Sequence, residues 1–319
     1  MAILYRDDLF QQHDTGRHPE NATRLQAIDA RLDGSGLLEL FEPGELRAAT
    51  DEELQFVHTG EHVQRLKALD EKGGGRIDGD TWMSPRSHEV ARVAAGCAVD
   101  AVAQALNGNH DKAACLVRPP GHHATPDQAM GFCLFNNVAV AAGYAKHRGL
   151  RRVLVVDWDV HHGNGTQDCF YNEENVYFMS SHRDPFYPGT GAKAETGTGS
   201  GLGTIFNLPT NFGIARERFI SNFRSRLEEA AEACQPELVL ISAGFDAHKN
   251  DPIGSLGLES EDFAMLTSIV CGVADTHANG RVVRLLEGGY NVDTLAESVE
   301  IHLRTILATT HRVDRLLSD

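Results

Sequence analysis

The sequence predicts an α/β domain with a mostly parallel central sheet and helices on both faces. Apolar strand-like runs alternate with longer helical patterns over most of the chain. The run at 153–156 is continuously apolar, as in a parallel strand that is covered on both faces. Clusters of polar residues that could bind a metal or transfer protons follow several of the apolar runs. In parallel sheets, ligands bind beyond the carboxyl ends of the strands. We therefore expect an active site at that edge.

Length and composition indicate one domain over residues 1–319. A chain of 319 residues with 41% hydrophobic content can bury one large core, and no linker divides it, although its N-terminal part looks irregular. The net charge of −16 argues against nucleic acid as the main partner. No apolar run reaches the roughly 20 residues of a membrane span. With six scattered cysteines, read as reduced thiols, and no signal peptide in 1–20, we expect a cytoplasmic protein.

The N-terminal third combines short elements with one long helix. A strand is expected at 2–6, and a helix from about Asn21. Thr50 and Glu53 have capping-box spacing, which predicts a short helix within 50–58. The other expectations are a helix at about 61–69, a Gly- and Asp-rich loop at 72–85, and an amphipathic helix at 87–106.

From residue 113 onward, strands and helices alternate. Helices are expected at 137–147, 217–233, 261–276 and 294–307, and strands at 113–117, 153–158, 176–180, 204–208, 238–242 and 282–286. The Gly-rich run at 196–203 does not fit G-x-G-x-x-G and opens no helix. It therefore reads as a flexible loop.

The segment 151–167, RRVLVVDWDVHHGNGTQ, carries the clearest chemistry. A buried strand is followed by Asp157, Asp159 and His161, which point the same way on an extended chain. Asp and His suit zinc or a similar divalent ion. Asp246, which follows the strand at 238–242, is the candidate third ligand, although an Asp there can also cap a helix.

Two further clusters suggest acid–base chemistry. His122 and His123 follow Pro–Pro–Gly, a rigid and then permissive stretch that fixes where the pair points. The pair best fits a site in which one histidine is the acid/base and the other is an electrostatic partner. The alternative is that the two histidines form an exposed polar turn. Tyr290 follows Gly–Gly at a strand end, where a phenol can stabilise an oxyanion or simply pack at a rim.

Taken together, the chain resembles the histone deacetylase family of the arginase–deacetylase superfamily. Its sequence motifs are most similar to those of the class II and bacterial deacetylase-like amidohydrolases. The match runs in order along nearly the whole chain. The matching segments are HPENATRLQAI (18–28), RPPGHHA (118–124), GFCLFNNVA (131–139), VVDWDVHHGNGTQ (155–167), SSHRDPFYPGTG (180–191), SAGFDAHKNDPIG (242–254) and LEGGYN (286–291).

The resemblance implies a zinc hydrolase of the arginase–deacetylase fold that cleaves an acyl amide of lysine or a related amine. By motif match, one Zn²⁺ is bound by Asp159, His161 and Asp246. His123 matches the general base that then serves as general acid. The expected partner is therefore an acylated lysine peptide or protein, or a small acylated amine.

The remaining catalytic positions carry supporting roles in the family. His122 stays electrostatic with Asp157 behind it, and Tyr290 polarises the acyl carbonyl. Asn164 stands where class I members have Asp, which predicts a lower pKa for His123.

The family holds the acyl-lysine stem in a narrow apolar tunnel. Phe132 and Tyr187 occupy the wall positions, with Tyr187 replacing the commoner Phe, and Gly131 allows close backbone approach. Ile253 lies where polyamine-selective members place an acidic gatekeeper. Its apolar side chain disfavours polyamine specificity.

The family also carries structural K⁺ or Na⁺ ions. One site would use the side chains of Asp157 and Ser180 and carbonyls around Asp159, His161 and Ser181, and a second would use carbonyls around Phe170, Glu173 and Val176.

Other readings stay open. Within the family, an acetylpolyamine or another small amide is an alternative substrate. A catalytically weak acyl-lysine binding module would be expected to lose Tyr290 or His123, and a binuclear manganese hydrolase like arginase would need more Asp ligands. The sequence leaves open the physiological substrate, the acyl length, Zn²⁺ against Fe²⁺, and the oligomeric state, with a homo-oligomer possible.

Overall fold

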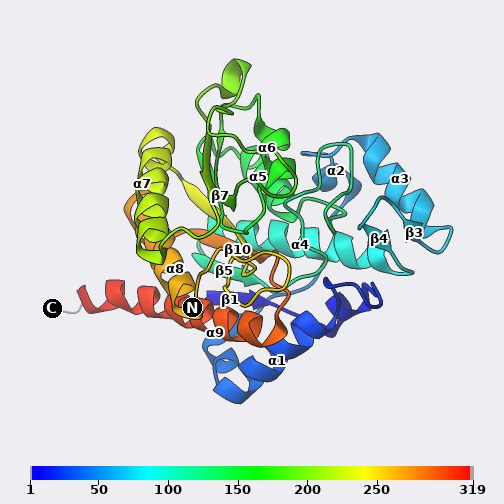
Figure 1. Ribbon diagram of the computed structural model, residues 1–319, viewed down its shortest axis with the longest axis horizontal. Coiled ribbons are helices and arrows are strands. Elements are labelled where there is room, and N and C mark those ends of the chain that lie inside the picture. The colour runs from blue at the N-terminus through cyan, green and yellow to red at the C-terminus, as the bar shows by residue number, and fades with distance from the viewer. Residues whose placement is uncertain (1, 317–319) are drawn as a thin grey trace.

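The fold is built on an eight-stranded sheet in the order β2-β1-β5-β10-β9-β6-β7-β8, in which every neighbouring pair is parallel. The computed structural model describes residues 2–316, with side chains through residue 308 (Figure 1). The predicted single α/β domain is confirmed. The strands are β1 (Ala2–Tyr5), β2 (Phe41–Pro43), β5 (Lys112–Cys115), β6 (Val153–Asp157), β7 (Val176–Arg183), β8 (Ile205–Thr210), β9 (Leu238–Ala243) and β10 (Val282–Leu286).

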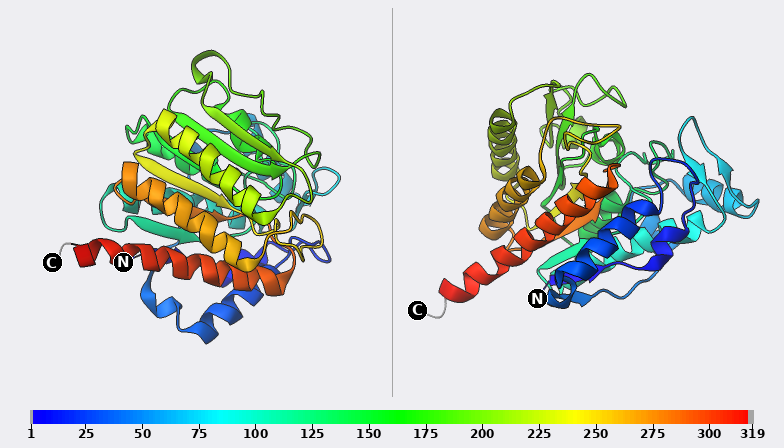
Figure 2. Two further views of the ribbon diagram at one scale, coloured as in Figure 1. Left: turned by 60° about the vertical axis from the view of Figure 1, so that its left-hand side comes forward. Right: turned by 60° about the horizontal axis from the view of Figure 1, so that its bottom comes forward.

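Helices cover both faces of the sheet (Figure 2). One layer contains α1 (Thr23–Ser35), α7 (Arg216–Cys234), α8 (Ser260–His277) and α9 (Val292–Leu316). The other contains α4 (Ser87–Leu106), α5 (Asn137–His147) and α6 (Asn164–Phe170), with α2 (Asp51–Leu54) and α3 (Gly60–Asp70) packed outside it. The capping box of Thr50 and Glu53 at the start of α2 is present as predicted.

The central strand β6 positions the site. All five of its residues are buried, because β9 and β7 flank it and helices cover its faces. In register, Asp157 lies beside Ser242 of β9 and Ser180 of β7. The polar residues that follow these strands therefore meet at one edge of the sheet.

Three expectations were wrong in detail. The N-terminal part is not simply irregular, because β2 joins the expected strand β1 in the sheet; three residues that include a proline make β2 too short for a pattern to reveal. The expected loop at 72–85 contains the hairpin β3 (Gly75–Arg76) and β4 (Trp82–Met83). The short helix expected within 50–58 is confirmed as the single turn α2.

The third difference is helix α6, which begins at Asn164 where the sequence predicted only a glycine turn. Most of its residues are buried, so tertiary packing outweighs the low helix propensity of Gly165. Short 3₁₀ segments occur at Asp8–Gln12, Leu38–Leu40 and, within the Gly-rich run, Gly199–Gly201.

Two global expectations concern cysteines and membranes. The six cysteines are free thiols. Over the described residues, none of the helices combines the length and apolar character needed to cross a bilayer.

Candidate active site

Four neighbouring strands deliver the predicted side chains to one edge of the sheet. The His122–His123 pair follows β5, and Tyr290 follows β10. Asp246 follows β9, and the segment with Asp159 follows β6. The structure therefore brings together residues that are separated by more than 160 positions in the chain.

The cluster of Asp159, His161 and Asp246 can hold a metal ion. All three residues are buried, and one donor atom from each lies within 4.8 Å of the others. His161 Nδ1 is 2.9 Å from Asp159 Oδ1 and 3.1 Å from Asp246 Oδ2. The His161 contact is an ion-pair distance without hydrogen-bond geometry, and among the described residues Asp246 Oδ2 accepts no hydrogen bond. An unsatisfied buried carboxylate oxygen beside an imidazole and a second carboxylate fits a divalent cation such as zinc.

Backbone groups fix the orientation of the two carboxylates. Asp159 Oδ2 accepts a hydrogen bond from the Gly288 N–H at 2.8 Å, and Asp246 Oδ1 accepts one from the Val160 N–H at 2.8 Å. A Cβ at Gly288 would lie 2.3 Å from Asp246 Oδ2 and 2.5 Å from Asp159 Oδ2. Only glycine therefore lets the turn after β10 close over the cluster.

The adjacent histidines have different partners. His122 Nδ1 is 2.9 Å from Asp157 Oδ2, whereas His123 Nδ1 is 2.7 Å from Asn164 Oδ1. The two rings are 4.0 Å apart. An amide oxygen accepts the Nδ1–H of His123, which leaves Nε2 as the basic nitrogen.

These different partners give the two histidines different pKa values. Burial lowers the pKa of His122, but the carboxylates of Asp157 and Asp159 outweigh it and raise the pKa to about 10. Burial and the positive charges of His122 and His161 hold the pKa of His123 well below its ordinary value. At neutral pH, His122 is therefore a cation and His123 a neutral base.

Tyr187 packs against the His123 ring, and Phe132 packs against Tyr290. The Tyr187 ring lies 5.1 Å from the His123 ring and is 39% exposed, so it reaches the surface. Phe132 packs edge-on against Tyr290 at 5.9 Å. A Cβ at Gly131 would lie 2.5 Å from His123 Cδ2, which explains the glycine. Burial raises the pKa of Tyr290 well above its ordinary value, so its hydroxyl stays a donor.

Sequence reasoning missed Glu287. One of its carboxylate oxygens accepts the N–H groups of Gly121 (2.7 Å) and His122 (3.2 Å), and the other accepts the Ser242 hydroxyl at 3.0 Å. Burial raises the pKa of Glu287 to about 7. The available signal was an acidic residue directly after a buried, mostly apolar strand.

Asp251 was missed in the same way. Its Oδ2 accepts the Tyr290 N–H at 2.7 Å, and its Oδ1 accepts the N–H groups of Ile253 and Gly254, both at 2.9 Å. Asp251 therefore connects the loop that carries half-buried Ile253 to the turn after β10 that carries Tyr290.

A buried charge network supports the site from the N-terminal segment. Arg118 Nη2 and Arg24 Nη1 donate to Glu20 at 2.9 and 3.1 Å. Arg24 Nε also donates to the Gly289 carbonyl at 2.6 Å, and its Nη2 donates to the Glu287 carbonyl. The network thus links the loop before the histidines to the turn before Tyr290, a role that the sequence did not reveal.

The residues predicted for structural cations fall into two places. The first set lies where the end of β6 runs beside β7, and Asp157 and Ser180 are neighbours in register there. Ser180 Oγ pairs with His182 Nδ1 at 2.9 Å. The second set lies in the connection from α6 to β7, where the Glu173 N–H donates to the Phe170 carbonyl. Both cation sites stay predictions.

Comparisons with a family model, with related proteins and with a solved structure all point to the same family. A model of the histone deacetylase domain matches residues 18–306. A histone deacetylase-like amidohydrolase of Pseudomonas aeruginosa is 41% identical over 275 residues, 86% of this chain and 72% of that protein. A probable deacetylase of Archaeoglobus fulgidus is 37% identical over 92% of this chain and 82% of its own length. The crystal structure of the HDA15 HD domain superposes with a TM-score of 0.90 at 37% identity, covering 96% of this chain and 90% of that one.

Proposed function

The chain belongs to the histone deacetylase family, and we propose that it is a zinc-dependent hydrolase that removes acetyl or other acyl groups from lysine side chains or related amines. The observation that carries the proposal is the buried Asp159–His161–Asp246 donor set, with its unsatisfied carboxylate oxygen, next to a neutral histidine. Membership of the family supports deacetylase or amidohydrolase activity.

Asp159, His161 and Asp246 would hold one divalent ion. A set of three protein ligands leaves positions open for water and substrate, as catalytic zinc sites do. A bound ion supplies Lewis acidity and makes water nucleophilic near neutral pH.

His123 would act as general base and then as general acid. Its Nε2 is free because Asn164 fixes the Nδ1–H tautomer, so it can take a proton from the attacking water and return it to the leaving amine. His122, a cation paired with Asp157, would stabilise negative charge without giving up its proton.

Tyr290 would stabilise the oxyanion. Its hydroxyl stays protonated, and the Asp251 contact to its N–H fixes the backbone that carries it. The acyl-lysine stem would pass between Phe132 and Tyr187, with Gly131 giving close approach. Ile253 offers no charge to a second amine, which favours acyl-lysine over acylpolyamine.

We further propose that K⁺ or Na⁺ binds structurally where the end of β6 runs beside β7, and also beside α6. The first site uses the Asp157 carboxylate, which also holds His122, so this ion would stabilise the catalytic edge.

A kinetic panel tests the proposal. With Zn²⁺ present, wild type should cleave acetyl-lysine or longer acyl-lysine peptides better than N-acetylpolyamines. Tyr290→Phe should reduce kcat by about 10²–10³, as loss of one oxyanion donor does. Tyr187→Phe, which removes a hydroxyl from the tunnel wall, is the matched control and should retain activity. A zinc-loaded wild type that cleaves none of these substrates would refute the proposal.

A further inference from the structure

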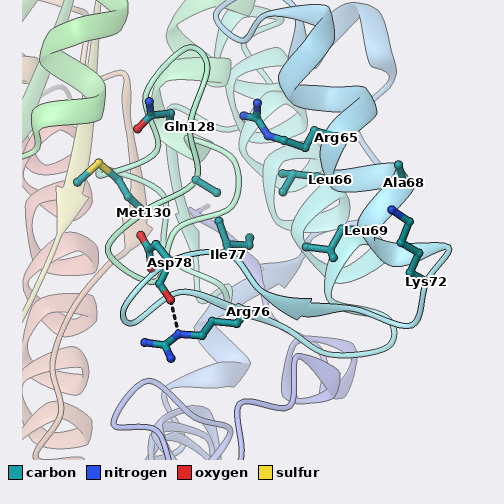
Figure 3. Close-up of a pocket in the computed structure, with 11 residues that line it drawn as sticks. Arg65, Leu66, Ala68, Leu69, Lys72, Arg76, Ile77, Asp78, Gln128 and Met130 are labelled. Carbon is teal, nitrogen blue, oxygen red and sulfur yellow. Dashed lines mark hydrogen bonds between the residues drawn. The ribbon is translucent and has the colours of Figure 1, made fainter.

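We propose that a pocket beside the active site binds a free medium-chain fatty acid, an apolar chain with one carboxylate. The pocket has a volume of about 570 Å³ and lies between α3, the β3–β4 hairpin and the segment 128–130 (Figure 3). Its location differs from the acyl-lysine site, because none of the proposed metal or catalytic residues lines it.

The interior of the pocket is apolar. Leu66 and Leu69 come from α3, Ile77 from the hairpin, and Ala129 and Met130 from the loop that precedes Gly131. In Figure 3, Leu66, Leu69 and Ile77 lie together in the middle of the view. Such a surface gains free energy by covering an alkyl chain.

Three cations surround this apolar patch. Arg65 lies above it, Arg76 below it and Lys72 to its right in Figure 3. Arg65 donates to the Asp127 carbonyl, and Arg76 donates to the carbonyls of Asp78 (2.5 Å) and Gly79 (2.8 Å). Backbone carbonyls do not neutralise a guanidinium.

The positive charges of these three side chains are not paired with carboxylates of the described residues. Within residues 2–308, no ion pair joins Arg65, Lys72 or Arg76 to an acidic side chain. The one acidic lining residue, Asp78, accepts the N–H groups of Asp80 and Thr81 in its own turn. In a chain of net charge −16, three cations without an ion-pair partner among the described residues, placed around an apolar patch, favour an anionic amphiphile as the ligand.

Met130 makes occupancy measurable. It lines the pocket, and its sulfur accepts a hydrogen bond from Asn164 Nδ2 at 3.5 Å. The chain has five methionines, so a sample with ¹³C-labelled methionine methyl groups gives few signals. Exposed Met265, on α8, reports non-specific surface binding.

The experiment titrates the intact protein with decanoate below its micellar concentration. Met130→Leu and Met265→Leu assign the two signals. The Met130 signal should shift saturably and the Met265 signal should not. Octanoate should bind more weakly by roughly fourfold for each methylene removed. Added salt should weaken binding because the rim is exposed.

A charge-matched pair of triple variants separates site binding from general attraction. Replacing the three rim cations with Gln should weaken decanoate binding by about tenfold, since exposed ion pairs each contribute modestly. A control variant removes three exposed cations elsewhere: Arg151→Gln, Arg218→Gln and Arg224→Gln. It should bind as wild type does. Thermal unfolding confirms that both variants are folded.

Three results would overturn the proposal. Met130 could show no saturable shift with decanoate. Decanol could bind as tightly as decanoate, which would remove the role of the cations. The two triple variants could bind equally well, which would place the carboxylate elsewhere. Because every readout is binding, none of these results depends on deacylase activity.

Discussion

At the scale of single residues, the site shows how neighbours give one residue type two functions. His122 and His123 are adjacent and both are buried, so burial alone would make both neutral. A carboxylate faces His122, and an amide faces His123. Asp157 and Asn164 therefore decide which histidine is a cation and which is a base.

This division predicts the effect of Asn164→Asp. A carboxylate 2.7 Å from His123 Nδ1 would stabilise the imidazolium and raise the pKa of His123. Because the base acts when neutral, the acid limb of the kcat/KM–pH profile should move up by about one pH unit or more. Asn164→Ala should lower activity without that upward shift. An unmoved limb in Asn164→Asp would show that Asn164 does not set the basicity of His123.

Glu287 should be important for positioning the histidine pair. In Glu287→Ala, the N–H groups of Gly121 and His122 lose their acceptor, and kcat should fall by about 10², as small displacements of catalytic groups do. Glu287→Gln keeps one acceptor oxygen and should restore part of the rate. Steady-state kinetics on both folded variants measures this. Equal, wild-type-like rates would contradict a positioning role.

At the scale of elements, the turns after the strands carry more of the function than the strands do. The sequence predicted every strand of the main sheet except β2, because each of these strands has a mostly apolar run. It could not predict α6, where packing outweighs the low helix propensity of Gly165, or β2, which is three residues long. The candidate metal ligands, the histidine pair and Tyr290 lie at one edge because each follows a strand of the sheet. Glu287 and Asp251 act through backbone contacts that no sequence pattern shows.

The turn after β10 gives an element-scale prediction. In Gly288→Ala, the new Cβ would meet both candidate metal carboxylates, so they must move apart from His161. Metal affinity should fall by at least about tenfold, as loss of supporting contacts does. Metal content after dialysis against a buffered chelator measures it. Gly272→Ala in α8, where a Cβ meets nothing within 4 Å, is the control and should keep wild-type affinity.

At the scale of the whole molecule, buried charges join the N-terminal segment to the catalytic edge. Glu20 is fully buried between Arg118 and Arg24, and Arg24 also holds the turn before Tyr290. The motif at 18–28 was visible in the sequence, but its role required the fold, because Glu20 and Arg118 are 98 residues apart. Removing one partner of such a network leaves a buried charge uncompensated.

The network predicts how stability depends on pH. Burial raises the pKa of Glu20, but Arg118 outweighs it and lowers the pKa to about 2. A carboxylate with a lowered folded-state pKa contributes stability above its unfolded pKa of about 4.3, and this contribution is lost as the pH falls toward 2. Glu20→Gln should therefore cost about 3–5 kcal/mol of unfolding free energy at pH 7.

Urea unfolding of wild type and Glu20→Gln between pH 7 and pH 3 measures this contribution. The difference between them should shrink as the pH falls below about 4.3, because wild type then loses what the variant already lacks. Glu89→Gln, which breaks the exposed Arg86–Glu89 pair, is the matched control and should change stability little at any pH. A constant difference across the whole range would show that Glu20 contributes by packing and not by its charge. Stability of the N-terminal segment and geometry of the catalytic turn are joined through Arg24, so Glu20→Gln should also lower kcat at neutral pH while the protein is still folded.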